Sequence, residues 1–209
     1  MQFIHALVRL LPVVLAFSVT ASGAQSLVSS ATSEELISAL GGDEDGGLPS
    51  KAFRRTAAPD AATHACPEAG GSDTAASAGS TSRNLSVVYA GDVGGAPPPS
   101  VNLSIQFATG SDRILPTSNV LLANLATALK APSMANARVA VAGHTDATGS
   151  RATNLQLSCA RAIAVRNHLI LQGVAPDRLG AYGFGPDKPL QLGAVESAVN
   201  RRVEIRRAN

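Results

Sequence analysis

Two short stretches of the chain place charged side chains at spacings that suit the binding of a small charged molecule. Residues 143–146, Gly-His-Thr-Asp, end on a carboxylate in a predicted loop. Farther along, Asn154, Leu157 and Arg161 follow at i, i+3 and i+7, which is one stripe of a helix two turns long. A carboxylate suits an ammonium group and a guanidinium suits a carboxylate. Asp146 and Arg161 could therefore frame a pocket for a zwitterion, beside the free N–H groups of a helix start.

Three other interpretations stay open on the residues alone. Asp146 and Arg161 could form a salt bridge that only holds the loop to the helix. A hydrolytic site could use Ser158 with His144, but no third group orients the histidine. A metal could bind His144 and Asp146, but no further Cys or His ligand lies nearby. We expect no enzyme activity, no metal and no other cofactor.

Strands and helices alternate around these residues, which indicates an α+β fold. Period-two runs predict strands, and apolar residues at helical spacing predict two helices, the first opened by Pro116 and the second closed by Gly173. We expect a mixed sheet of about four strands with the helices packed on one face, in the order βαβαββ. The strands are expected at 101–107, 139–143, 178–185 and 201–206, and the helices at about 116–131 and 154–172. The helical side of the core is expected to contain Leu121, Leu125, Leu129, Ala162, Val165 and Leu169.

The first hundred residues differ in character from the rest. Residues 1–24 have the order of a signal peptide, with a basic start, a short apolar run and small residues before Gln25, and an uncleaved anchor is the alternative. Residues 25–40 contain a short helical segment with Ser33 as a plausible N-cap. Residues 41–100 are rich in Gly, Ala, Ser and Pro, which predicts a disordered linker, with 85–89 as an isolated strand at most. A folded domain is expected over 101–209.

Charge and aromatic content argue against nucleic acid as a partner. Residues 1–100 hold 5 Lys/Arg and 9 Asp/Glu, and residues 101–209 hold 12 and 6. The cations of the basic half are interleaved with acids and apolar residues, as on a solvated face. Only five Phe, two Tyr and no Trp are present, which is too few for a surface that stacks bases.

The two cysteines, Cys66 and Cys159, leave three states open. They could pair in an oxidising compartment and close a long loop. They could also remain free thiols, or pair with another molecule.

The signature residues together resemble a known family. The pattern G-H-T-D-x-x-G-x-x-x-x-N-x-x-L-S-x-x-R-A occurs over residues 143–162, and N-R-R-V-E-I follows at 200–205. Upstream, Phe107 is followed by Gly110 and Ser111 at the matching spacing. Residues from about 101 to 206 therefore resemble the peptidoglycan-binding domain at the C-terminus of the OmpA family, which peptidoglycan-associated lipoprotein and the stator protein MotB share.

That resemblance implies a binding module that holds the stem peptide of the cell wall through meso-diaminopimelate and does not cleave it. Asp146 would pair with the ammonium group and Arg161 with a carboxylate, while Asn154 and Leu157 line the pocket. Thr145 and Arg202 complete the candidate binding residues. The alternative is a protein-interaction or assembly module of the envelope with the same fold. The implied location is the periplasm after export, with association to the outer membrane left open, and residues 25–100 could contact other envelope proteins.

Overall fold

The computed structural model describes residues 26–41, 64–66 and 98–208. The predicted signal peptide, most of the predicted linker and the predicted strand at 85–89 lie outside these residues. None of the helices within the described ranges is long and apolar enough to span a membrane.

A mixed sheet of five strands forms the centre of the described part, in the spatial order β1-β2-β5-β3-β4. The central strand β5 runs antiparallel to both β2 and β3, while β1 is parallel to β2 and β4 is parallel to β3. The α+β class and the mixed sheet are confirmed. The strands are β1 (Leu27–Val28), β2 (Ser100–Leu103), β3 (Arg138–His144), β4 (Leu179–Gly185) and β5 (Val203–Ala208).

The number of strands is five rather than about four, because β1 was not expected. It has only two residues, too few for an alternating pattern to be recognised. The strand expected at 101–107 ends at Leu103, and Phe107 instead pairs with Ile114 in an isolated bridge.

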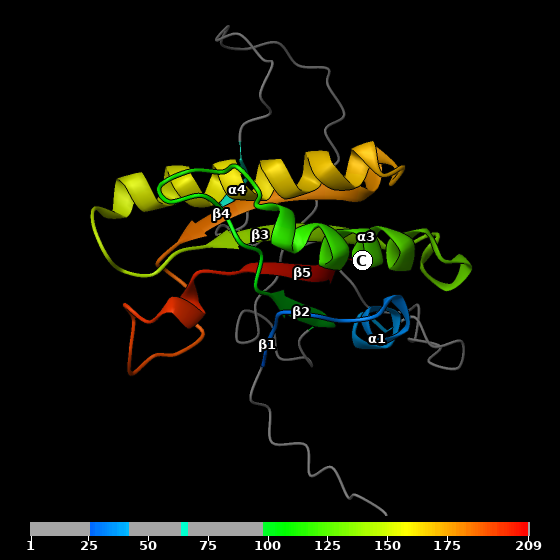
Figure 1. The fold of residues 1–209 in the computed structure, drawn as a ribbon, viewed down its shortest axis with the longest axis horizontal. Helices are drawn as coiled ribbons and strands as arrows, with labels where there is room; N and C mark the ends of the chain where they lie inside the picture. The colour runs from blue at the N-terminus through cyan, green and yellow to red at the C-terminus, as the bar shows by residue number, and fades with distance from the viewer. Residues whose placement is uncertain (1–25, 42–63, 67–97, 209) are drawn as a thin grey trace, which may run out of the picture.

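Helices cover one face of the sheet, as Figure 1 shows. They are α1 (Ser33–Ala39), α3 (Asn119–Lys130), which continues from the 3-10 turn η1 (Pro116–Ser118), and α4 (Arg151–Leu171). Further 3-10 turns are η2 (Pro132–Met134), η3 (Pro176–Arg178) and η4 (Ala198–Asn200). All six predicted helical core residues are buried, which confirms that side of the core.

Successive side chains of each strand point to opposite faces of the sheet, which produces two separate apolar clusters. Toward the helices, the strands contribute residues such as Leu103, Val141 and Ile205 to one large cluster. On the opposite face a smaller cluster contains Ala140, Ala142, Tyr182, Phe184 and Ala208. The sheet thus has a helix-covered face and a second face with its own buried residues.

Helix α1 packs into the large cluster, because Leu36 and Leu40 are fully buried. Its N-cap is Thr32 and not Ser33: the Thr32 hydroxyl accepts a hydrogen bond from the Glu35 N–H, and the Glu35 carboxylate accepts one from the Thr32 N–H. The sequence prediction was wrong by one residue here, since Ser and Thr are both good caps and adjacent in the chain.

Residues 64–66 pair with the free edge of β4. Ala65 forms an antiparallel bridge with Tyr182, and the Cys66 N–H donates to the Ala181 carbonyl. A disulfide joins Cys66 to Cys159 in α4, which decides among the three states left open by the sequence. A segment distant in sequence is therefore linked covalently to the helix of the signature.

Candidate functional site

Helix α4 approaches the sheet closely, and glycines make that approach possible. A Cβ at Gly143 would overlap the carbonyl oxygen of Ser158 and lie 2.9 Å from its carbonyl carbon. A Cβ at Gly183 would lie 2.7 Å from the backbone nitrogen of Cys159. The Ser158 hydroxyl donates to the Leu155 carbonyl and accepts from the Gly185 N–H, at 2.8 and 2.9 Å. The start of α4 is thereby fixed against the ends of β3 and β4.

The loop between β3 and α4 is fixed by hydrogen bonds from a buried side chain, Asn154. Asn154 is buried, and its amide donates to the carbonyls of Thr148 and Asp146, at 2.9 and 3.3 Å. The Ser150 side chain caps α4 by accepting from the Thr153 N–H. The helix therefore begins three residues before the expected Asn154, whose amide anchors the loop that presents Asp146.

Asp146 pairs with Arg201, not with Arg161. An Nη1 of Arg201 lies 2.7 Å from Oδ2 of Asp146, and Oδ1 accepts from the Thr148 N–H at 3.1 Å. Burial raises the pKa of Asp146, but the hydrogen bonds from Arg201 and Thr148 outweigh it and lower the pKa below its usual value. The carboxylate is therefore ionised at neutral pH, and its side chain is 12% exposed.

Arg161 is half-buried and is held by two other residues. Its Nε donates to the Ser111 carbonyl at 3.1 Å, and its guanidinium carbon lies 4.9 Å from the centroid of the Phe107 ring. Burial and the nearby charge of Arg201 lower the pKa of Arg161, while Asp146 and Asp112 raise it. The structure thus brings Arg161, Arg201 and Asp146 into electrostatic range of one another. The guanidinium remains a cation, since the ordinary arginine pKa is far above 7.

Two further predicted binding residues are Thr145, next to Asp146 in the chain, and Leu157, one turn before Arg161 on α4. Thr145 is buried, its N–H donates to the Gly185 carbonyl, and its hydroxyl has no hydrogen-bond partner among the described residues. Leu157 is half-buried on α4, one turn before Arg161. Leaving a buried hydroxyl without a hydrogen bond costs free energy. The Thr145 hydroxyl, next to Asp146 in the chain, could therefore gain stability by bonding to a ligand.

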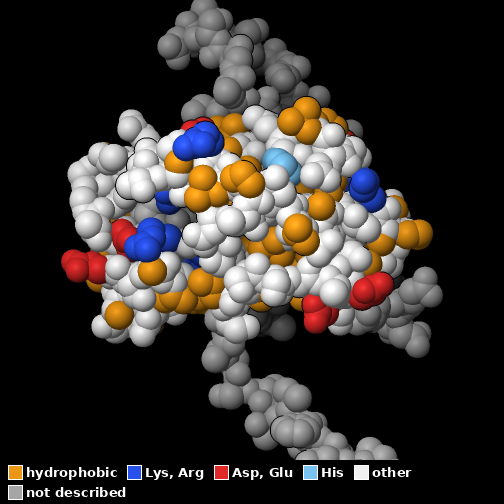
Figure 2. Space-filling model, in the orientation of Figure 1, with side chains coloured by type: hydrophobic (Ala, Val, Ile, Leu, Met, Phe, Trp, Pro, Cys, Tyr) orange, Lys and Arg blue, Asp and Glu red, His pale blue; other side chains and the backbone are white. Residues whose placement is uncertain are grey.

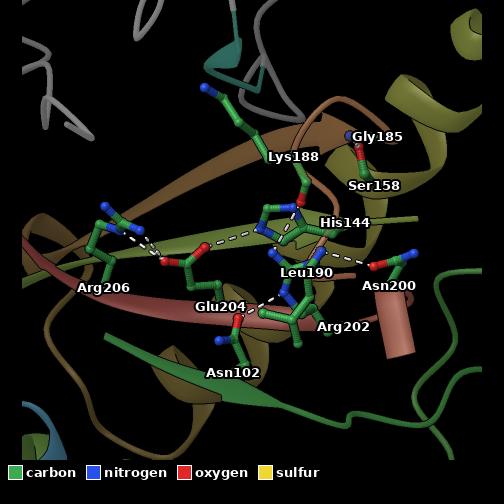
Figure 3. Close-up of polar contacts among 10 residues, drawn as sticks. All are labelled: Asn102, His144, Ser158, Gly185, Lys188, Leu190, Asn200, Arg202, Glu204 and Arg206. Carbon is green, nitrogen blue, oxygen red and sulfur yellow. Dashed lines mark hydrogen bonds and ion pairs between the residues drawn. The ribbon is translucent and has the colours of Figure 1, made fainter. Parts of the chain in front are cut away.

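Arg202 lies on the other face of the sheet. Its Nε donates to the Asn102 side chain at 2.7 Å and its Nη2 donates to the Lys188 carbonyl at 3.1 Å (Figure 3). Arg201 pairs with Asp146 while Arg202 bonds to Asn102 and Lys188, so the two adjacent arginines have different partners. Arg202 is therefore bonded away from the Asp146 loop.

Figure 3 also shows a buried polar network on that second face. Nε2 of His144 lies 3.3 Å from Oε2 of Glu204, and Nε of Arg206 donates to the other oxygen at 2.9 Å. Burial lowers the pKa of His144 to about 4, helped by Arg202 and Arg206 and opposed by Glu204. Burial raises the pKa of Glu204, but His144 and Arg206 outweigh it and bring the value to about 2. His144 is thus neutral and Glu204 charged at pH 7.

These contacts bear on the catalytic and metal interpretations. Ser158 bonds to the backbone of Leu155 and Gly185, and His144 faces Glu204, so the two do not form a nucleophile and base pair. No group of three or more His, Cys, Asp or Glu side chains in the described ranges is arranged to hold a metal ion.

Sequence reasoning missed Arg201 as the partner of Asp146. The sequence offers two adjacent arginines, and the strand expected at 201–206 begins only at Val203, so it is the structure that shows Arg201, at the end of η4, as the partner of Asp146. Asn200 positions this arginine: its side chain accepts from the N–H groups of Leu190 and Gln191 and donates to the carbonyls of Ala194 and Val195. In Figure 2, basic and acidic side chains lie close together at the left, the end of the molecule where α4 begins in Figure 1.

Comparisons with known proteins give relatives for this part of the chain. Outer membrane porin F of Pseudomonas fluorescens is 41% identical over 106 residues, which are 50% of this chain and 32% of that protein. Peptidoglycan-binding protein ArfA of Mycobacterium tuberculosis is 38% identical over 103 residues, 48% of this chain and 31% of that protein. The chain therefore spans about a third of the length of these curated relatives.

A solved structure and a family model match the same part. The crystal structure of the peptidoglycan-associated lipoprotein from Burkholderia pseudomallei is 30% identical, covers 50% of this chain and 86% of that one, and has a TM-score of 0.43. The model of the OmpA family matches residues 106–202, which include Phe107, the Asp146 loop, Arg161 and Arg201. Residues 106–202 of the chain are therefore a domain of the OmpA family.

Proposed function

We propose that this domain binds peptidoglycan without cleaving it, through the meso-diaminopimelate of the stem peptide. The observation that supports this function best is the cluster of one ionised carboxylate and two guanidinium groups: Asp146 in the loop before α4, Arg161 in the middle of α4 and Arg201 at the end of η4. A diaminopimelate side chain ends in an ammonium and a carboxylate on one carbon, so a cluster with both signs of charge complements it.

Each group has a role in this proposal. Asp146 accepts hydrogen bonds from the ammonium group, and Arg161 donates to the carboxylate. The contacts of Arg161 with Ser111 and Phe107 hold its guanidinium in place before the ligand arrives, which lowers the entropy lost on binding. Thr145 offers a hydroxyl that the described residues leave without a partner. Leu157 supplies apolar contact for the methylene chain of the ligand.

The affinity for a single stem peptide is expected to be low. Two charge-assisted contacts contribute roughly 1.5 to 3 kcal/mol each, and association costs several kcal/mol. Micromolar binding requires about 8 kcal/mol, more than these two contacts supply, so we expect a dissociation constant of about a millimolar or weaker. Because the wall is a polymer, repeated engagement would still retain the protein there.

The relatives support this function through their names. ArfA is named a peptidoglycan-binding protein, and the Burkholderia relative is named a peptidoglycan-associated lipoprotein. The OmpA family is non-catalytic. In accord with this, Ser158 bonds to Gly185 and His144 contacts Glu204, so the two side chains do not act on each other. The shared part is about a third of the curated relatives, so the similarity supports the domain's activity rather than that of the whole protein.

Export to the periplasm is part of the proposal. Relatives include an outer membrane porin and a peptidoglycan-associated lipoprotein, which are proteins of the envelope. The Cys66–Cys159 disulfide supports an oxidising compartment, since such bonds are rare in the cytosol. The order of residues 1–24 supports a signal peptide, and residues 25–100 remain the candidate contact for other envelope proteins.

The experiment is co-sedimentation of the purified mature protein with isolated diaminopimelate-containing sacculi. Wild type should pellet at low salt, and Asp146→Ala and Arg161→Ala should stay largely in the supernatant. Arg151→Ala is a matched control, because Arg151 is an exposed arginine of α4 whose partner is Asp187 and not Asp146. If wild type stays in the supernatant, or both site variants pellet like wild type, the envelope assembly module becomes the better account.

A further inference from the structure

The side chain of Arg201 has one partner among the described residues, the Asp146 carboxylate. Arg201 is about half exposed on its side chain, whereas Asp146 is 12% exposed. The other contacts of that carboxylate come from the backbone N–H and the side chain of Thr148, whose carbonyl is in turn held by Asn154. Of the two groups on Asp146, only Arg201 can therefore leave without disturbing the loop.

We propose that Arg201 occupies the ammonium position of the site in the unliganded protein and moves to the ligand's carboxylate when the ligand binds. This inference rests on the proposed function, since it assigns a role within the same site. The ligand's ammonium takes the place of the Arg201 guanidinium on Oδ2 of Asp146. Arg201 then joins Arg161 on the carboxylate, which is attached to the same carbon as the ammonium.

The charges of the cluster favour such an exchange. Asp146, Arg161 and Arg201 together carry two positive charges and one negative charge; Arg161 is repelled by Arg201 and attracted by Asp146 and, to a smaller extent, by Asp112. An ammonium alone would displace Arg201 and add a third cation without a new anion. A zwitterion instead brings its own carboxylate, so Asp146, Arg161 and Arg201 all keep an opposite charge beside them.

A ligand preference follows from this count of charges. The site should discriminate strongly for a residue that has both an ammonium and a free carboxylate, and against lysine, which has the ammonium alone. Arg201 contributes to that preference in two ways. It competes with any ligand ammonium for the Asp146 carboxylate, and it binds the carboxylate of those ligands that have one. Removing Arg201 should therefore change the two affinities in opposite directions.

The test is calorimetric titration of wild type, Arg201→Gln and Arg151→Gln with two muropeptides that differ only in the third residue, diaminopimelate or lysine. Arg201→Gln should bind the diaminopimelate peptide about tenfold more weakly and the lysine peptide about threefold more tightly. Arg151→Gln, which breaks the exposed pair with Asp187 instead, should match wild type with both. Thermal unfolding of the variants confirms that each is folded.

Other outcomes overturn the inference in distinguishable ways. If Arg201→Gln weakens both peptides by the same factor, Arg201 only orients Asp146, and the exchange does not occur. If it leaves both affinities unchanged, Arg201 has no part in recognition. If wild type binds neither peptide, the proposed function itself fails, and the inference fails with it.

Discussion

Gly143 and Ser158 are in backbone contact, so that β3 and α4 meet with no side chain between them. A Cβ on Gly143 would overlap the Ser158 carbonyl oxygen. The same serine uses its hydroxyl to bind the Gly185 N–H at the end of β4. The distance between sheet and helix, and with it the position of the loop that presents Asp146, depends on this contact.

Gly143→Ala should destabilise the domain severely. The added methyl group would force α4 away from β3, and overpacking of this kind against a backbone costs about 3 kcal/mol or more. Urea denaturation would measure the loss. Gly193→Ala is the matched control, because a Cβ there meets nothing within 4 Å. Equal midpoints for the two variants would show that the helix can shift without cost.

Asn154→Ala should weaken both the fold and ligand binding. The amide holds the carbonyls of Thr148 and Asp146, and leaving such buried acceptors without a donor costs about 1 to 3 kcal/mol. Denaturant midpoints and muropeptide titration would check both effects. Gln156→Ala, at an exposed position of the same helix, should change neither. Wild-type affinity in Asn154→Ala would mean that the loop keeps its shape without the amide.

Stability should fall on acidification because of His144. The unfolded chain takes up this proton near pH 6.5, whereas the folded protein does so only near pH 4. Between these values the unfolded state binds more protons, so the free energy of unfolding decreases as the pH falls, by about 3 kcal/mol over the window. Glu204 has the same sign and extends the loss from pH 4.5 to about 2. Chemical denaturation at a series of pH values measures both.

His144→Asn separates the histidine from the other groups. The variant should have lower stability at pH 7, because the contact with Glu204 is changed, but a flatter dependence on pH between 6.5 and 4. Arg202 and Arg206, which also lower the pKa of His144, remain in place in this variant. An unchanged slope in the variant would show that other residues cause the acid sensitivity.

Reduction of the Cys66–Cys159 disulfide should lower stability and release residues 64–66 from β4. A native disulfide that closes a loop of this length typically contributes about 2 to 4 kcal/mol. Thermal unfolding with and without reductant measures the first effect. Hydrogen exchange at the Cys66 amide, which donates to Ala181, reports the second. The Cys66→Ser/Cys159→Ser variant should be insensitive to reductant, and a wild type that is equally insensitive would contradict the prediction.

The parts of the fold that the sequence predicted are those with a long local pattern. Leu121, Leu125 and Leu129 repeat at helical spacing and are buried, and Val203 and Ile205 alternate and face the same core. Gly173, which was predicted to close the second helix, has the positive φ of +89° that glycine allows at a helix end. The two-residue strand β1 has no such pattern, and its place beside β2 depends on pairing with a strand about 75 positions later in the chain.

The sequence located the elements that carry the candidate residues better than it predicted the contacts between those residues. The spacing of Asp146, Asn154 and Arg161 located the loop and the helix, but spacing does not say which cation lies against which anion. The chain between 146 and 201 includes β4 and a long loop, so only the tertiary structure brings Arg201 to Asp146. The Cys66–Cys159 pair depends in the same way on residues 64–66 lying along β4.

The most direct test of the central claim is a nuclear magnetic resonance titration of labelled protein with a diaminopimelate-containing tripeptide. The account predicts shifts confined to the amides of residues 145–149 and to the side-chain Nε groups of Arg161 and Arg201, with no comparable change at Arg206 on the second face. Saturation should follow one binding curve for all three groups. Shifts centred on the His144–Glu204–Arg206 network, or no shifts at millimolar peptide, would contradict it.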